Sequence, residues 1–387
     1  MVNVKQGTVI MQMGARLYYF TRYPCSPLPN TPPHPPRNWP CLTGVTTTCQ
    51  RWAILNNRLT FVLAATALAT LFAAAPVQAQ TYCVFDPMGA QGDFYAMAKD
   101  YVIASKRWGV QLVLRPYTDE SIAVEDFKAG QCDMINMTGL RARQFNQFTG
   151  TIDSVGGLEN YAQFHDLLNL MSSPKIAKYM SSGPYEVDGI FPIGAGYPFV
   201  NDRNINTLAK AAGKRVAVMD WDKTQSMLVE SVGAQPVASD ITNYGSKFNN
   251  GSVDIIIAPI VLYKPFELYR GLAHHGGIVR RPVIELSMQM VSRRDRFPEG
   301  FGEESREYTG GQIDRAFGVI HDQENQVDPR SWVYSSTVTR DEYYKLMRDA
   351  RIHLARDGFF DHRMLSILKR VRCTSDPDSA ECALADE

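Results

Sequence analysis

Two segments of the chain repeat one pattern of apolar and polar positions. The stretches FKAGQCDMINMTG (127–139) and FNNGSVDIIIAPI (248–260) each place a Gly three positions after a Phe, and an Asp three positions after that Gly. An apolar run follows the Asp in both segments. This pattern predicts the end of a helix, a glycine turn and an inner β-strand, built twice in one chain.

The first copy closes a longer alternation of predicted elements. Strands are predicted at 82–88 and 110–117, and a helix between them carries apolar residues at helical spacing from Phe94 to Trp108, with Asp93 as its N-cap. A second helix at 119–130 ends at Gly130, before the strand CDMINMT. This βαβαβ order predicts a parallel sheet.

The second copy closes a similar alternation. Its predicted elements are helices at 204–213, 223–233 and 240–251, the last capped by Asp240, and strands at 214–220, 234–239 and 252–260.

Long extended segments connect the two units. The segments 186–200 and 280–298 read as crossing strands, and 299–372 is strongly helical. We therefore expect an α/β fold of two lobes, with two crossover strands and C-terminal helices that return to the first lobe. The predicted lobes are 80–190 with 290–387, and 191–289. Ligands of such sheets bind outside the carboxyl ends of the strands, which places the predicted site in the cleft between the lobes.

The charge distribution is uneven along the chain. Residues 1–79 hold six basic residues and no acidic one, so 80–387 hold 34 Lys and Arg against 40 Asp and Glu, a formal charge of −6. A mildly acidic body lacks the basic stripe that a nucleic-acid partner requires.

The N-terminal region predicts export. Residues 51–79 combine a basic start, an apolar run and the small-x-small signal VQA, which is typical of a secretory signal peptide cleaved after Ala79. The alternative is a transmembrane anchor. No lipobox precedes Cys83. The proline-rich segment 1–50 is expected to be a disordered or non-native extension, and the mature protein is expected in the periplasm.

Export makes disulfides the expected state of the cysteines. Four cysteines remain beyond residue 79, and none forms a C-x-x-C motif of the redox or zinc type. Cys373 and Cys382 flank a polar loop and are predicted to pair, which leaves Cys83 with Cys132. The alternative is four free thiols.

Two candidate ligand-binding turns lie in the first lobe. The turn GAQGD follows a strand and precedes a helix, so its backbone N–H groups suit an anion or a carbonyl. Its candidates are Met88, Gly89, Gly92 and Asp93. The alternative is a tight turn that only caps the helix.

The turn after the first inner strand carries two arginines. Thr138 and Gly139 are expected to reach the cleft, and Arg141 or Arg143 could clamp a carboxylate. The alternative role of either arginine is a salt bridge at the surface or between the lobes.

The second lobe offers an aromatic and acidic turn. Asp220, Trp221 and Asp222 suit a cationic or amphipathic ligand by charge and cation–π contact. The alternative is that Trp221 takes part in lobe packing and Asp222 caps a helix.

Three further residues are placed to close over a ligand. Pro259 ends the second inner strand, Tyr263 follows it, and Tyr197 lies on a crossover segment. The alternative for them is hinge packing.

Motifs of catalysis or metal binding are not found in the sequence. The adjacent histidines of AHHGG (273–277) do not share one face of a helix or strand, so no metal is expected. G-x-S-x-G, Walker-type and H-E-x-x-H patterns are absent. We expect neither a cofactor nor an enzyme activity.

The chain resembles a known class of exported proteins over most of 80–370. The carrying segments are FDPMGAQGDFYAMAKDY, YTDESIAVEDFKAGQCDM, GLRARQFNQFTGTIDSVGGL and GKRVAVMDWDKTQSMLVESVGAQPV. They resemble the two-lobed solute receptors of TRAP transporters (the DctP-like group). In their residues they are most similar to the AdeT-type solute-binding proteins, sometimes described as efflux-associated. The resemblance implies a non-catalytic protein that captures a small organic solute in the periplasm and delivers it to a membrane transporter.

One position departs from the receptor pattern. The arginine that TRAP receptors use for a substrate carboxylate corresponds to Ala217 in the frame GKRVAV, and Arg215 is expected to point to the other side of the strand by the period of two. The resemblance to carboxylate receptors therefore does not extend to this contact. Two other functions stay open: an enzyme on the same scaffold, and an accessory protein of an envelope transport or efflux complex.

Overall fold

The computed structural model describes residues 4–5, 8–13, 16–21, 79–273, 275–334 and 337–387. The chain divides into two units, Met1–Ala75 and Pro76–Glu387. In the first unit, β1 (Val4–Lys5), β2 (Thr8–Met13) and β3 (Arg16–Thr21) form an antiparallel sheet, which the expectation of an unstructured extension did not include. The rest of that extension and the predicted signal peptide before Ala79 lie outside the described residues.

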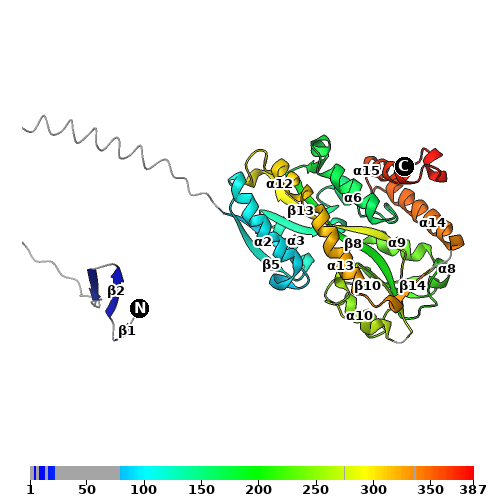
Figure 1. Ribbon diagram of the computed structural model, residues 1–387, viewed down its shortest axis with the longest axis horizontal. Helices are drawn as coiled ribbons and strands as arrows, with labels where there is room; N and C mark the ends of the chain where they lie inside the picture. The colour runs from blue at the N-terminus through cyan, green and yellow to red at the C-terminus, as the bar shows by residue number, and fades with distance from the viewer. Residues whose placement is uncertain (1–3, 6–7, 14–15, 22–78, 274, 335–336) are drawn as a thin grey trace, which may run out of the picture. The chain divides into compact units, whose positions relative to one another are not determined.

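The second unit is built on one path of hydrogen-bonded strands, in the order β10-β9-β11-β8-β13-β6-β4-β5 (Figure 1). The strand bounds are β4 Gln80–Phe85, β5 Leu112–Tyr117, β6 Met134–Thr138, β8 Tyr185–Val200, β9 Arg215–Met219, β10 Gln235–Ser239, β11 Ile255–Ala258 and β13 Ile284–Arg293.

The first α/β unit has the predicted βαβαβ order. Strand β4 pairs in parallel with β5 on one side and β6 on the other. The connections carry helices α2 (Asp93–Ser105) and α3 (Glu120–Lys128). Asp119 caps α3 by accepting the N–H groups of Ser121 and Ile122, and Gly130 follows with a φ of 77°.

The start of α2 differs from the sequence prediction. Gly92, and not Asp93, is the N-cap residue, and Asp93 is the first residue of the helix. The side chain that accepts the N–H group of Tyr95 belongs to Asp86, from the end of the preceding strand. A Cβ at position 92 would lie 1.9 Å from Asp86 Oδ1, so only glycine allows this approach.

The second α/β unit repeats the arrangement. Strand β9 pairs in parallel with β10 and β11, and the helices are α9 (Lys223–Ser231) and α10 (Tyr244–Asn249). Two predicted helices are shorter than expected. The segment predicted from 204 to 213 forms only α8 (Leu208–Ala211), and α10 begins four residues after Asp240 because that side chain caps a preceding turn.

The two long strands β8 and β13 pair antiparallel with each other and connect the two α/β units, as predicted for the crossovers (Figure 1). Strand β13 pairs with β6 of the first lobe, where Met288 lies opposite Thr138. The last residues of β8 pair with β11 of the second lobe, where Tyr197 lies opposite Ala258. The first lobe is thus the group β5, β4, β6, and the second lobe is the group β11, β9, β10.

The C-terminal segment contacts both lobes. Its helices are α12 (Phe301–Gly310), α13 (Ile313–Asn325), α14 (Thr337–Arg356) and α15 (His362–Ser375). Helices α12 and α13 pack on β8, and α15 packs on α6 (Tyr161–Met171). However, β14 (Trp332–Val333) pairs with β12 (Gly277–Val279), and α14 contacts α9. The helices therefore do not return to the first lobe alone.

Short elements complete the fold, and the chain contains both predicted disulfides. The short elements are α4 (Gly139–Ala142), α5 (Gln147–Gly150), α7 (Ala177–Met180), β7 (Ser181–Ser182) and α11 (Tyr269–Leu272). Cys83 bonds to Cys132 across the parallel pair β4–β6, and Cys373 bonds to Cys382. Within the described residues, no helix is both long enough and apolar enough to span a membrane.

Apolar side chains fill both faces of the first-lobe sheet. Ile135 and Phe127 pack with Phe164 of α6 on one face. On the other face, Val84 and Tyr101 form a separate cluster. The strands are thus buried on both sides, as parallel strands are, and their carboxyl ends remain for a site.

Candidate functional site

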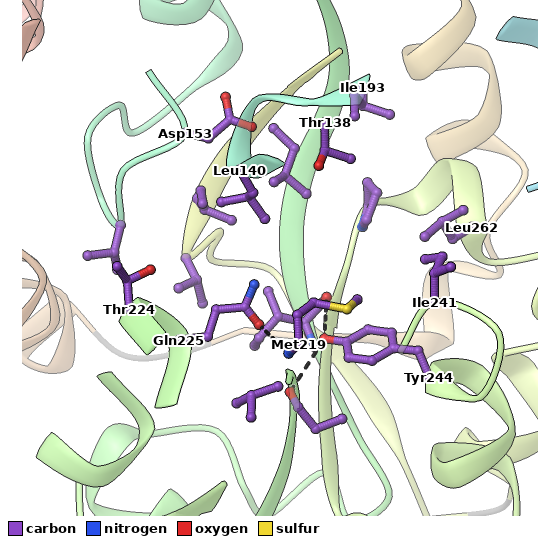
Figure 2. Close-up of a pocket in the computed structure, with 18 of the residues that line it drawn as sticks. Thr138, Leu140, Asp153, Ile193, Met219, Thr224, Gln225, Ile241, Tyr244 and Leu262 are labelled. Carbon is purple, nitrogen blue, oxygen red and sulfur yellow. Dashed lines mark hydrogen bonds between the residues drawn. The ribbon is translucent and has the colours of Figure 1, made fainter. Parts of the chain in front are cut away.

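A cavity of about 160 Å³ lies where the inner strands of the two lobes end. Thr138, the last residue of β6, lines it from the first lobe, and Pro259, directly after β11, lines it from the second. Figure 2 shows Thr138, Leu140 and Asp153 on one side of the space, and Met219, Gln225 and Tyr244 on the other. This is the place predicted from the repeated Gly-turn-Asp pattern.

The wall of this cavity is mostly apolar. Of the described residues that line it, none is Lys, Arg or His, and the polar ones are Thr138, Asp153, Thr224, Gln225 and Tyr244. The remaining wall is aliphatic, aromatic, proline or methionine; it includes Phe94, Leu140, Ile193, Val218, Leu228, Ile257, Leu286 and Met288.

Ala217 stands in this wall, on β9. Arg215 is remote from the cavity, but strand alternation is not the reason, because residues two apart share a face. Arg215 lies at the first residue of β9, the opposite end from the cleft, and its Nη2 is 2.8 Å from Asp254 Oδ1. It therefore supplies no charge to the cavity.

Asp153 is the one carboxyl group in the wall, and the sequence analysis did not single it out. It is 1% exposed and accepts hydrogen bonds from the backbone N–H (3.0 Å) and the hydroxyl group (2.6 Å) of Ser287 on β13. Burial raises the pKa of Asp153 to about 7, and these hydrogen bonds and Arg143 only partly offset that effect. This carboxyl group can therefore be neutral near physiological pH.

Gly139 is explained by the position of Asp153. A Cβ at position 139 would lie 2.4 Å from Ser287 Oγ and 2.6 Å from the Asp153 carboxyl group. Glycine is required here because β13 and the Asp153 loop approach the start of α4 closely. Its role is thus packing around the Asp153–Ser287 pair.

The polar groups from the second lobe are held in place by other contacts. Gln225 Oε1 accepts the backbone N–H of Met219 at 2.9 Å. The Tyr244 hydroxyl group donates to the carbonyl of Ile257 at 3.0 Å. The Gln225 amide group is therefore fixed at the cavity wall.

The two candidate arginines contact side chains of the chain itself. Arg141 Nε lies 3.0 Å from Glu120 Oε2, and its guanidinium carbon lies 4.0 Å from the centroid of the Trp221 ring. Arg143 Nη2 lies 2.9 Å from Asp222 Oδ1. The Arg141–Trp221 contact and the Arg143–Asp222 ion pair join the turn after β6 to the turn after β9, so they connect the two lobes. The structure thus brings these four predicted residues together without a ligand.

Asp222 has two roles in this arrangement. It caps α9 by accepting the N–H and hydroxyl groups of Thr224, and it binds Arg143. Trp221 provides the aromatic face predicted from sequence, but the cation on that face is Arg141. Asp220 does not line the cavity.

The remaining predicted residues apart from Pro259 do not line the main cavity. Met88 and Asp93 line a neighbouring cavity of about 70 Å³, which shares Pro87, Phe94, Ile193 and Leu262 with the main one. Gly89 has a φ of 58° in the turn before α2. The Tyr197 hydroxyl group donates to Glu324 at 3.1 Å, and Tyr263 packs against aromatic rings. Tyr197 thus follows its alternative role, that of hinge packing.

A second buried carboxyl group lies on the crossover strand β13. Glu285 is 1% exposed, and neither of its carboxylate oxygens has a hydrogen-bond partner among the described residues. Burial raises its pKa well above the usual range, and the carboxyl groups of Glu324 and Asp153 raise it further. The sequence signal was an acidic residue inside a strand that otherwise reads as buried.

Two buried arginines support the cavity wall from the C-terminal helices. Arg351 Nη1 donates to the carbonyl of Val155 (3.0 Å), and its Nε lies 2.9 Å from Glu387. Arg372 binds Glu381 and donates to the carbonyl of Gly157. These contacts hold the loop that carries Asp153 and Val155. Within the described part of the chain, no group of three or more His, Cys, Asp or Glu is arranged to hold a metal.

Comparison with known proteins gives the family. The model of the family "Solute-binding protein AdeT 1/2" matches residues 102–387. The probable solute-binding protein AdeT1 of Acinetobacter baumannii is 48% identical over 304 residues, which cover 79% of this chain and 100% of that protein. AdeT2 of the same organism is 26% identical over 61% of this chain and 99% of that protein.

Solved structures share the fold. A TRAP periplasmic solute-binding protein from Rhodoferax ferrireducens with bound malonate has a TM-score of 0.61 and 11% identity, over 77% of this chain and 100% of that chain. One from Desulfovibrio salexigens with bound orotic acid has a TM-score of 0.58 and 16% identity, over 77% of this chain and 99% of that chain. The fold is thus the two-lobed fold of these proteins, and by sequence the chain belongs to the AdeT 1/2 family of solute-binding proteins.

Proposed function

We propose that this protein binds a small organic solute in the cavity between its lobes, in the periplasm, and delivers it to a membrane transporter. The observation that carries the proposal is the cavity of about 160 Å³ between Thr138 and Pro259, at the ends of the two inner strands. Two crossing strands join the lobes, which is the connection that hinge closure around a ligand requires.

The periplasmic location is supported by the cysteines and by the predicted signal peptide. Both disulfides join cysteines beyond residue 79, and disulfides persist in oxidising compartments. We propose cleavage after Ala79, so that the mature chain begins at Gln80.

The proposed role is binding without a chemical step. The polar groups at the cavity hold neighbouring parts of the chain: Asp153 binds Ser287, Gln225 binds the backbone of Met219, and Tyr244 binds that of Ile257. Such contacts position a wall around a solute.

Mass spectrometry of the protein purified from a periplasmic extract tests the proposal. Under native conditions we expect the mass of a chain that begins at Gln80, with both disulfides intact and with one small molecule bound. Loss of that molecule on unfolding should then allow its identification. A chain that retains residues 51–79, or that carries four alkylatable thiols, would contradict export. A chain without a bound molecule, which also binds none after refolding with candidate solutes, would contradict the binding role.

A second function is favoured by one observation, the contacts that the lobes make with each other. Arg143 with Asp222, and Arg141 with Trp221, connect the lobes directly through their side chains. An accessory protein of an envelope transport or efflux complex could use the closed form itself to bind a protein partner. A stable complex with a membrane partner, formed equally well by variants with a filled cavity, would favour this second function.

A further inference from the structure

A second, mostly apolar cavity in the second lobe adjoins the main cavity. The second cavity, of about 110 Å³, lies between β9, α8, α9 and α14. The two cavities share five lining residues, which are Val216, Leu228, Val229, Ile257 and Val283. They therefore adjoin at these five side chains, and the second cavity lies beside Tyr343 and Met347 of α14.

The first cavity is unsuited to an ionised acid. Among the described residues, no basic one lines it, and the arginines nearest the cleft are bound to Glu120 and Asp222. An ionised group placed there would lose its hydration, would gain no counter-charge, and would face the Asp153 carboxyl group. The second cavity is lined by Arg281, whose guanidinium carbon lies 5.5 Å from the centroid of the Tyr343 ring.

The same walls favour an apolar solute. Aliphatic and aromatic side chains dominate both cavities, and burial of apolar surface against them contributes about 25 cal/mol for each Å². In another protein, an apolar cavity of about 150 Å³ takes benzene, so the main cavity has the size for a ring or a short chain.

The first cavity also provides one polar region. Thr138 and Asp153 reach it from the first lobe, and Gln225 reaches it from the second (Figure 2). These groups can exchange hydrogen bonds with one hydroxyl, carbonyl or amide group. Toward α14, the wall of the second cavity is mostly aliphatic, and its polar residues are Asn206, Thr207, Arg281 and Tyr343.

We propose that the solute is an uncharged amphipathic molecule, with one hydrogen-bonding group near Thr138, Asp153 and Gln225 and an apolar body that extends toward α14. This inference rests on the proposed solute-binding function and specifies its ligand class. It differs from the carboxylates that are bound in the structural neighbours from Rhodoferax and Desulfovibrio.

The test uses the exported protein, unfolded and refolded to remove any bound molecule. Binding is followed with N-phenyl-1-naphthylamine, an uncharged probe that fluoresces in apolar surroundings, and displacement is measured with 1-octanol and with octanoate at pH 8. Because these competitors share one chain and differ in charge, we expect 1-octanol to displace the probe at a concentration at least tenfold lower. From 1-hexanol to 1-octanol, affinity should rise about threefold to fourfold for each added methylene.

Two variants locate the binding. Ala217→Arg places a charged side chain in the wall, and we expect at least tenfold weaker probe binding. Ala238→Arg is the matched control, because Ala238 is exposed on the neighbouring strand β10, opposite Val218, and should change binding less than twofold. If Ala217→Arg does not fold, Leu228→Asn at the junction of the cavities replaces it, since Leu228 is partly exposed.

The outcomes separate this inference from the proposed function. Equal or stronger displacement by octanoate, or tight binding of malonate to the native protein, would overturn the uncharged ligand class and leave solute binding intact. Probe binding that neither variant in the wall changes would place the probe outside the cavities and overturn the inference as well. Failure of every charged and uncharged solute to bind would overturn the proposed function itself.

Discussion

Arg143, in the turn after the inner strand of the first lobe, forms an ion pair with Asp222, which caps a helix of the second lobe. The distance from Arg143 Nη2 to Asp222 Oδ1 is 2.9 Å, and the two side chains are 12% and 1% exposed. Because the pair is shielded from water, loss of one partner leaves an uncompensated buried charge, which is strongly destabilising. The ion pair therefore contributes both to the contact between the lobes and to the stability of the chain.

The first prediction concerns this ion pair. Asp222→Asn keeps an oxygen for the helix cap and removes the charge opposite Arg143. We expect the free energy of unfolding to fall by roughly 2–4 kcal/mol, and small-angle scattering to show a larger radius of gyration without solute. The matched control is Asp328→Asn, since Asp328 pairs with an Arg330 side chain that is 90% exposed; it should change stability by less than about 1 kcal/mol. An unchanged radius in Asp222→Asn would show that this pair does not hold the lobes together.

The second prediction concerns Trp221. Its ring contacts the Arg141 guanidinium, so Trp221→Ala should weaken the closed form, and Trp221→Phe should retain part of the effect because a smaller aromatic face remains. We expect a loss of about 1 kcal/mol in unfolding free energy for Trp221→Ala, measured by denaturant titration. Equal effects of the two substitutions would contradict a contribution of the aromatic face at this position.

The sequence pattern does not identify Asp222 as the partner of Arg143. The period-two and helical patterns depend on burial within one lobe, so β4 to β6 and β9 to β11 could be predicted in order. The partner of Arg143, by contrast, is 79 residues away in another lobe, and no local pattern encodes that distance. A ligand clamp and an interlobe pair require the same residue types at this turn.

Asp153 illustrates a second limit of prediction. Its neighbours Thr151 and Ser154 are polar, and the segment reads as a surface loop, yet the structure buries it against β13 and the C-terminal helices. Long-range contacts of the segment, among them those of Ser287, Arg351 and Arg372, produce this burial. Thr138 and Pro259, in contrast, were found because strand ends follow from the pattern itself.

The third prediction is a dependence of stability on pH. The pKa of Asp153 is raised to about 7 in the folded protein, so the folded state holds a proton that the unfolded state has already released above about pH 4. Stability should therefore fall as pH rises from about 4 to 7 and level off above that range. Asp153→Asn removes this group and keeps partners for Ser287, so the fall in stability that Asp153 causes between about pH 4 and 7 should disappear.

Thermal unfolding between pH 5 and 8.5 measures this effect. Arg143, Glu120 and Glu285 act on the same region, and all three are present in both proteins, so the difference between the two curves reports Asp153. Parallel curves for the native protein and Asp153→Asn would contradict a raised pKa at this position.

The fourth prediction compares the two disulfides. Cys83 and Cys132 are 49 residues apart, and Cys373 and Cys382 are 9 apart. Chain-entropy arguments give about 4 kcal/mol for the longer loop and about 2.6 kcal/mol for the shorter one. The pair of substitutions Cys83→Ser with Cys132→Ser should thus lower the unfolding free energy more than the pair at 373 and 382. A reversed order would mean that the C-terminal loop, which holds Glu381 against Arg372, contributes more than its length indicates.

The most direct test of the account is a thermal-shift screen of the refolded exported protein, side by side with Ala217→Arg, against uncharged amphipathic molecules and carboxylates. A solute at 100 times its Kd adds roughly 2.7 kcal/mol to the folded state. We expect at least one uncharged solute to raise the Tm of the native protein by several degrees and to leave that of Ala217→Arg unchanged. Flat curves for the native protein across the whole panel would contradict a solute-binding cavity between the lobes.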